Sequence, residues 1–147
     1  NNIFKQYSNI DTIYHLAALL SGVGEKYPLQ CWNVNINGTF NIFELSKKYN
    51  IKNILIPSSI AVYGPNAPKF AKQESPVNPT TMYGITKVSV ELLSEYYNNK
   101  YGMNIRGLRL PGIISYQTMP GGGTTDYAVE IFYKALMDGE YTCFLNK

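Results

Sequence analysis

Two apolar, strand-like segments flank one long helical segment, and this order constrains the fold more than any other feature of the chain. Residues 11–18 are a short apolar run, residues 29–49 have helical periodicity, and residues 54–56 are the triplet Ile-Leu-Ile. Continuous apolar runs are typical of strands buried in a parallel sheet. A helix between two such strands is a crossover connection, which is right-handed in nearly all proteins. The sequence therefore predicts an α/β fold with a parallel sheet.

The alternation of helix and strand continues along the rest of the chain. Residues 83–101 are periodic, follow the candidate caps Thr80 and Thr81, and end at Gly102, a typical helix terminator. Four further segments are expected: a glycine-punctuated loop at 19–25, a strand at 105–110, a helix at 128–138 and the start of another strand at 141–145.

Both long helical segments carry apolar residues on two sides. In residues 83–101, one stripe is Ile85, Val88, Leu92 and Tyr96, and the other is Val90, Leu93, Tyr97 and Tyr101. One side must face the sheet, which leaves the second side for another surface. We expect a homodimer through the helices at 33–49 and 83–101. The alternative is that more of the same chain covers this side.

Composition narrows the class of protein. The chain has 147 residues, is 45% hydrophobic and carries a net charge of +3 without blocks of like charge, so a globular domain without a nucleic-acid or membrane partner is expected. No apolar run approaches the roughly 20 residues that cross a bilayer, and the start does not resemble a secretory signal. We expect an intracellular, cytoplasmic protein, with a mitochondrial location open in a eukaryote. Cys31 and Cys143 belong to no Cys/His cluster, so no metal site is expected.

Tyr83 and Lys87 are the first candidate catalytic pair. They lie four residues apart at the start of a helical segment and therefore share one face. An ammonium near a tyrosine hydroxyl favours the phenolate and lowers a pKa that is normally about 10, which would make the tyrosine a general base. The pair alone is weak evidence for a catalytic site, because a chain with 13 tyrosines can show this spacing by chance. The alternative is a surface tyrosine beside a solvated lysine.

Other candidate groups fall at the expected carboxyl edge of the sheet, where open α/β sheets bind ligands. Ser58 and Ser59 follow the second strand, and the proline-rich segment 64–80 is typical of a loop that covers a site. Residues 120–125 end in Thr124 and Thr125 just before a helix, whose free N–H groups could bind a carboxylate. A flexible surface loop is the alternative for these residues. The single histidine, His15, is expected to be structural rather than catalytic.

Five motifs occur in the order and spacing of a known family. They are His15-Leu16-Ala17-Ala18, Asn35-Ile36-Asn37-Gly38-Thr39, Ser58-Ser59-Ile60-Ala61-Val62-Tyr63-Gly64, Glu74-Ser75-Pro76-Val77-Asn78-Pro79 and Tyr83-Gly84-Ile85-Thr86-Lys87. Together they resemble the extended short-chain dehydrogenase/reductase family of NAD-dependent epimerases and dehydratases. Within it, residues 18–25, 108–115 and 120–129 are similar to the short-chain type of L-threonine 3-dehydrogenase.

The resemblance implies part of a Rossmann-like, doubly wound parallel sheet. Residues 1–115 would be the later part of the NAD-binding domain, with the catalytic residues, and residues 116–147 the start of a substrate-binding region. No G-x-x-G-x-x-G fingerprint precedes residue 11, so we expect the first strands and their pyrophosphate turn to be missing and the fragment alone to be inactive.

The resemblance also implies roles for individual residues. NAD would oxidise the 3-hydroxyl of L-threonine to 2-amino-3-oxobutanoate, with Tyr83 as general base, Lys87 holding the nicotinamide ribose and lowering the tyrosine pKa, and Ser59 bonding the reacting hydroxyl. The expected cofactor-binding residues are Tyr83, Lys87, Leu16, Ala17, Ala18, Asn35, Pro111 and Ile113. The expected substrate-binding residues are Ser59, Tyr83, Ser21, Thr124 and Thr125.

Two other functions remain open. A nucleotide-sugar 4-epimerase could use the same Tyr83, Lys87 and Ser59. A dehydratase is disfavoured, because Ile60 and Ala61 stand where those enzymes place acidic residues. The second alternative, from another class, is a non-catalytic binding protein or an inactive fragment derived from the family.

Overall fold

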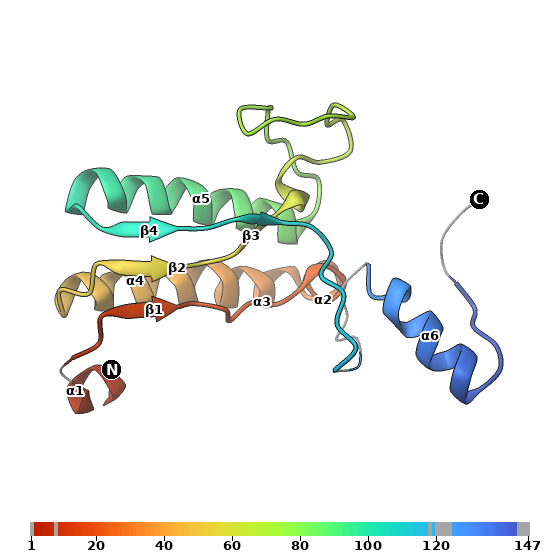
Figure 1. The fold of residues 1–147 in the computed structure, drawn as a ribbon. Coiled ribbons are helices and arrows are strands. Elements are labelled where there is room, and N and C mark those ends of the chain that lie inside the picture. Colours follow the sequence, from red (N-terminus) through yellow and green to blue (C-terminus); the bar gives the residue numbers. More distant parts are fainter. Residues whose placement is uncertain (1, 8, 118, 120–124, 144–147) are drawn as a thin grey trace.

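A parallel sheet of three strands forms the centre of the molecule (Figure 1). The computed structural model describes residues 2–7, 9–117, 119 and 125–143. Strands β1 (Thr12–Tyr14), β2 (Asn53–Leu55) and β4 (Asn104–Arg106) lie in the order β1-β2-β4, with Ile13, Ile54 and Ile105 side by side. Beyond them, β3 (Ser58–Ser59) pairs in parallel with β5 (Arg109–Leu110). The predicted α/β fold with a parallel sheet is confirmed.

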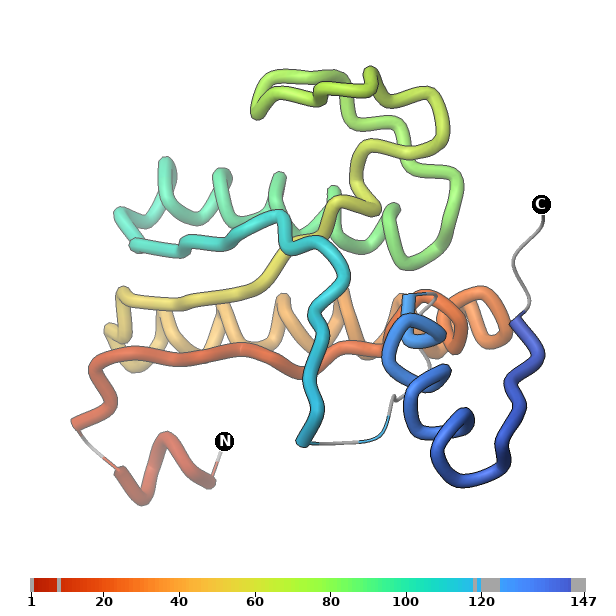
Figure 2. The backbone as a smooth tube through the Cα atoms, turned by 45° about the vertical axis from the view of Figure 1, so that its right-hand side comes forward, coloured from red at the N-terminus to blue at the C-terminus, as the bar shows by residue number. Residues whose placement is uncertain are grey.

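Helices α4 (Gly38–Lys48) and α5 (Met82–Tyr101) lie on the same face of this sheet (Figures 1 and 2). The core fills the space between these helices and the sheet. It consists of Ile36, Phe43, Ile54, Ile56, Val90, Tyr97, Met103 and Ile105. On the strands, Tyr14 is 68% exposed and Leu55 is 38% exposed. A doubly wound sheet carries helices on both faces. In this chain α4 and α5 cover one face.

The first long helical segment has three parts. Helix α3 (Pro28–Trp32) begins with Pro28 at its first position, as expected, because proline has no N–H to leave unpaired there. A π-helical stretch, Asn33–Asn37, follows and leads into α4. The predicted extent, 29–49, is nearly right, but its regular 3.6-residue periodicity is wrong at the π stretch. There the backbone turns Asn35 and Ile36 inward, and both are buried.

Helix α5 has the ends that the sequence predicts. The hydroxyl of Thr81 accepts a hydrogen bond from the N–H of Gly84 at 3.0 Å, and Gly102 takes the left-handed conformation at φ 63°. Of the two expected stripes, one is buried at Val90 and Tyr97. The other is exposed at Ile85 (39%), Leu92 (62%) and Tyr96 (47%). The inner stripe therefore builds the core, and the outer stripe lies on the surface of the chain.

Several predicted boundaries are wrong. The segment expected as a loop at 19–25 forms helix α2 (Ser21–Lys26), because Gly24 lets its turn pack on Cys31, whose Sγ would lie 3.0 Å from an added Cβ. Strand β1 ends at Tyr14, so His15 lies after the strand rather than within it. Residues 141–143 form no strand, and 144–145 lie outside the described residues.

Two terminal helices complete the fold. Helix α6 (Tyr127–Met137) covers nearly the expected range, and α1 (Asn2–Gln6) was not expected. Short 3₁₀ geometry at Ile60–Val62 follows β3. Among the described residues, no helix combines the length and apolarity needed to span a bilayer.

The predicted strand 105–110 is divided at Gly107 into β4 and β5. The N–H of Ile56 bonds the carbonyl of Arg106, and the N–H of Ser58 bonds the carbonyl of Leu108, each at 2.9 Å. Between these bonds the backbone at Gly107 comes so close to β2 that an added Cβ would lie 2.3 Å from the carbonyl oxygen of Ile56. Only glycine fits without moving the backbone, and the strand bends there toward the β3–β5 pair.

We expect Gly107→Ala to lower the free energy of unfolding by about 1–3 kcal/mol, because the methyl group must displace backbone. The measurement is a urea unfolding midpoint. Gly38→Ala is the matched control: its Cβ would meet nothing closer than 3.9 Å, and alanine favours the helix by roughly 0.5–1 kcal/mol. Equal midpoints for the two variants would contradict this account of the bend.

Candidate functional site

A cleft of about 720 Å³ lies where the strands end and α5 begins. It is lined by every predicted site residue that the structure describes: Leu16, Ala17, Ala18, Ser21, Asn35, Ser59, Tyr83, Lys87, Pro111, Ile113 and Thr125. Thr124 lies outside the described residues. Segments separated by more than 100 residues thus meet in one cleft, at the edge of the sheet that the sequence predicts.

Close backbone packing brings Tyr83 to Ser59. At Gly84, an added Cβ would lie 2.6 Å from the carbonyl oxygen of Ala61 and 2.7 Å from Pro79. The first turn of α5 therefore packs directly on the segment that follows Ser59. The Ser59 side chain accepts the N–H of Ala61 at 3.2 Å, and it lies near enough to the Tyr83 hydroxyl for hydrogen bonding to lower the pKa of this tyrosine. A hydroxyl of a substrate placed in the cleft would face both groups.

The pKa of Tyr83 is raised above its ordinary value, contrary to the expectation that Lys87 would lower it. Burial raises this pKa, and the hydrogen bond with Ser59 lowers it only in part. The Lys87 Nζ donates to the carbonyl oxygen of Pro57 at 2.7 Å and lies 5.5 Å from the centre of the Tyr83 ring. The ammonium is thus beside the ring and held by the strand end, so the cost of burying a phenolate dominates.

Lys87 is itself a buried cation, only 7% exposed. Burial lowers its pKa, and the nearby Cys31 thiol partly opposes this effect. The described residues give its ammonium a backbone carbonyl as partner rather than a carboxylate. Such a group can still attract an electron-rich ligand in the cleft.

The Asn35 side chain connects the two sides of the cleft. Its Oδ1 accepts the N–H of Leu19 at 2.8 Å, and its Nδ2 donates to the Leu19 carbonyl at 3.1 Å. The same Nδ2 lies 3.1 Å from the Thr86 hydroxyl, which donates to the Tyr83 carbonyl at 2.8 Å. One buried amide thus joins the backbone after Ala18 to the turn that carries Tyr83, in keeping with the supporting polar network expected of it.

His15 also lines the cleft and has a defined partner. Its Nε2 lies 3.0 Å from the Thr39 hydroxyl, which donates to the Asn35 carbonyl at 2.6 Å, so Nε2 is the donor. Burial lowers the pKa of His15, and the charge of Lys87 lowers it further. The bond to Thr39 anchors the imidazole at the cleft, and the structural role expected of His15 stays a prediction.

Sequence reasoning missed three polar residues around the site. Thr39 and Thr86 lie within the recognised motifs, and each comes one helical turn after a buried group that it supports. Glu25 accepts the N–H of Met82 at 2.7 Å and so fixes the start of α5 from α2. The sequence could have indicated the two threonines, because Thr39 lies four residues after Asn35 and Thr86 lies three residues after Tyr83. No sequence pattern indicates the contact of Glu25, because the glycines around it predict a loop.

The donors in the cleft fit the nicotinamide half of a dinucleotide. Ribose hydroxyls can accept from the Lys87 ammonium and bond the Tyr83 phenol, and Ala17 and Ala18 leave the backbone open to close approach. Pro111 and Ile113 provide an apolar wall. In the ranges that the structure describes, no three His, Cys, Asp or Glu side chains are placed to hold a metal ion.

Known proteins resemble the chain in sequence and structure. A curated relative from Staphylococcus epidermidis, named an uncharacterized epimerase/dehydratase, is 45% identical over all of this chain and 47% of its own length. The solved L-threonine dehydrogenase of Phytophthora infestans is 53% identical with a TM-score of 0.91, over 99% of this chain and 47% of that one. The chain thus spans about half the length of the relatives it matches.

Two further similar structures are enzymes with different described activities. A monomeric L-threonine 3-dehydrogenase from a metagenome is 49% identical with a TM-score of 0.93, over 99% of this chain and 47% of its own. A UDP-N-acetylglucosamine 4-epimerase from Methanobrevibacter ruminantium is 26% identical with a TM-score of 0.79, over 100% and 47%. The family model described as NAD dependent epimerase/dehydratase matches residues 1–143. Because this model matches nearly the whole chain, the chain belongs to the NAD-dependent epimerase/dehydratase family.

Proposed function

We propose that the full-length protein oxidises the 3-hydroxyl of L-threonine with NAD and forms 2-amino-3-oxobutanoate. The observation that carries the proposal is that one cleft is lined together by Ser59, Tyr83, Lys87 and Thr125. The similarity to L-threonine dehydrogenases, at 49–53% identity in two solved structures, supports threonine as the substrate.

In this proposal, NAD supplies the acceptor for the hydride that leaves Cβ of threonine. The residues of this chain handle the proton. Ser59 would orient the substrate hydroxyl, and Tyr83, as phenolate, would take the proton from that hydroxyl as the carbonyl forms. Lys87, fixed by the Pro57 carbonyl, would hold the ribose beside Tyr83 and add positive charge to the site. Because burial raises the pKa of Tyr83, positive charge brought into the cleft would favour the phenolate that the reaction needs.

The amino acid groups of threonine would be held on the opposite side of the cleft. We propose Ser21, Thr124 and Thr125 for this role, with residues 116–147 as the start of the substrate-binding region. The packing of Thr125 supports its part: a Cβ on Gly112 would lie 2.8 Å from its Oγ1, so its hydroxyl is held next to the Pro111 segment. Residues 1–115 would supply the cofactor side.

A nucleotide-sugar 4-epimerase is the second candidate, because the epimerase structure shares the fold at 26% identity. The experiment that separates the two uses the full-length protein with NAD and follows the absorbance of reduced nicotinamide. Threonine should produce a steady increase that UDP-sugars do not. Turnover of a UDP-sugar between its 4-epimers, without reaction of threonine, would overturn the proposal in favour of the epimerase.

Tyr83→Phe in the full-length protein should lower the turnover of threonine by at least about 10²-fold, because the base is lost while the ring remains. The affinity for NAD should change little. The wild-type rate should rise with pH from neutral toward alkaline values, since a raised Tyr83 pKa leaves little phenolate near neutrality, and the variant should lose this rise. Tyr14→Phe, at a tyrosine 68% exposed and outside the cleft, is the control. Near-normal turnover in Tyr83→Phe would refute its role.

We further propose that the protein forms a homodimer through the helices at 33–49 and 83–101. The exposed stripe of α5 (Ile85, Leu92 and Tyr96) and the 45% exposed Phe40 of α4 support this interface. Burial of such side chains against a second copy is favourable by roughly 25 cal/mol per Å² of apolar area. The solved relative described as monomeric argues for a direct measurement.

Sedimentation velocity of the full-length protein should give a dimer that Leu92→Arg converts to a monomer, because a charge would be buried in the interface. Phe70→Arg is the control, since Phe70 is 83% exposed on the proline-rich segment and away from both helices. A monomeric wild type would end this proposal without affecting the proposed reaction.

A further inference from the structure

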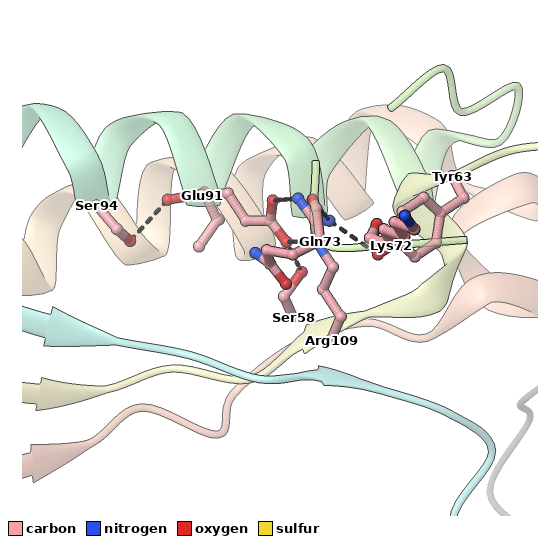
Figure 3. A network of polar contacts seen from close by, with 8 residues as sticks. Ser58, Tyr63, Lys72, Gln73, Glu91, Ser94 and Arg109 are labelled. Atoms are coloured by element: carbon pink, nitrogen blue, oxygen red, sulfur yellow. Dashed lines mark hydrogen bonds and ion pairs between the residues drawn. The ribbon is translucent and has the colours of Figure 1, made fainter. Parts of the chain in front are cut away.

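The carboxylate of Glu91 is the centre of a polar network beside the cleft that the proposed reaction does not use (Figure 3). Glu91 lies on α5 one turn after Lys87. Its Oε1 accepts from the Ser58 hydroxyl at 2.5 Å and from the Arg109 Nε at 3.0 Å, and its Oε2 accepts from the Arg109 Nη2 at 2.8 Å. This is the two-pronged geometry that only arginine offers to a carboxylate.

The rest of the Arg109 guanidinium points to the proline-rich segment. Its Nη1 donates to the Tyr63 hydroxyl and to the Gln73 carbonyl, each at 2.9 Å, and the guanidinium carbon lies 5.0 Å from the centre of the Tyr63 ring. Tyr63 in turn donates to the Lys72 carbonyl at 3.1 Å. The Arg109 side chain therefore connects α5 to segment 64–80. It binds the Gln73 carbonyl of this segment directly and the Lys72 carbonyl through Tyr63.

The ion pair at the centre of the network is partly shielded from water, whereas the bonds to the carbonyls of Lys72 and Gln73 are exposed. The Arg109 side chain is 15% exposed and that of Glu91 is 27% exposed, so the pair is less screened than the surface pairs Lys47–Glu44 and Lys134–Asp138. Burial alone would raise the pKa of Glu91, but the bonds from Arg109 and Ser58 outweigh it and leave this pKa below its ordinary value. The carboxylate therefore stays charged at neutral pH, and the contacts persist.

The strand pairing that carries Ser59 is short. β3 and β5 pair over two residues only, Ser58 with Arg109 and Ser59 with Leu110. A pairing this short specifies register weakly. The bond from Ser58 to Glu91 fixes the residue next to Ser59 against α5, and both serines line the cleft. Lys87, one turn earlier on α5, holds the Pro57 carbonyl in the same way.

We propose that Arg109 is a positioning residue that fixes segment 64–80 and the Ser58–Ser59 strand end against α5 through Glu91. Segment 64–80 reaches the cleft at Gly64, Pro65 and Thr80, so the same contacts that fix the strand end also hold this wall of the cleft. The part of the inference that concerns turnover rests on the proposed oxidation of threonine, whereas the part that concerns the segment does not.

The test compares hydrogen–deuterium exchange in full-length wild type, Arg109→Lys, Tyr63→Phe and the double variant. Lysine can pair with Glu91 but cannot also reach Tyr63 and Gln73, so exchange in residues 64–80 should increase about tenfold, while exchange in α5 stays unchanged. Tyr63→Phe breaks only the connection to Lys72 and leaves the bond from Arg109 to Gln73, so its increase should be smaller. The double variant should show no more than Arg109→Lys alone, because that change already breaks both connections. Lys134→Gln, which removes an exposed ion pair, is the control.

Kinetics in the same proteins complete the test. In Arg109→Lys the kcat for threonine should fall about tenfold, with the KM for NAD within about twofold, because the wall of the cleft formed by segment 64–80 is loosened and the cofactor side is not. Unchanged exchange in 64–80, or an equal increase in α5 together with a lower unfolding midpoint, would overturn the proposal. If exchange responds as stated but the wild type does not oxidise threonine, the positioning role stands and the proposed function fails.

Discussion

The hold of α5 on the end of the second strand is the interaction on which the candidate site depends. Two consecutive turns of the helix each bind one residue of this strand end: Lys87 binds the carbonyl of Pro57, and Glu91 binds the hydroxyl of Ser58. Gly84, one turn earlier, removes the Cβ that would hold the helix away. Ser59 is the next residue of the strand, so its distance from Tyr83 follows from these three contacts.

The electrostatics of the cleft follow from the same packing. Lys87 and Tyr83 are close because α5 lies tightly on the strand, but the same burial raises the pKa of the phenol and lowers the pKa of the ammonium. Burial disfavours the charged form of each group. A ligand of opposite or delocalised charge in the cleft would change this balance more than it could at an exposed site.

Much of this arrangement could be predicted from the sequence, because it depends on local patterns. The apolar run at 54–56, the cap at Thr81 and the glycine at 102 each determine a strand or a helix end, and the expected elements α3 to α5 are found close to their predicted bounds. The order of strand and helix then places the site residues at one edge of the sheet. The roles of Ser59, Tyr83 and Lys87 stay predictions that experiment must test.

What could not be predicted depends on contacts between distant segments. The direction of the Tyr83 pKa shift depends on how deeply the ring is buried and on the 2.7 Å bond that draws Lys87 to Pro57. Helix α2 contains two glycines, which favour a loop, but one of them, Gly24, allows close packing on the distant Cys31. Arg109 and Glu91 lie 18 residues apart in sequence, and no spacing rule connects them.

The π-helical stretch at Asn33–Asn37 limits how this protein can change in evolution. A π turn holds more residues than an α turn, and here the wider turn lets both Asn35 and Ile36 point inward. Because the wider turn accommodates one extra residue, deletion of one residue could restore a regular helix with the segments on either side nearly in place. Asn35 and Ile36 could then not both point inward, so either the amide would leave the cleft or the isoleucine would leave the core. The extra residue is therefore what lets one stretch of helix serve the cleft and the core at the same time.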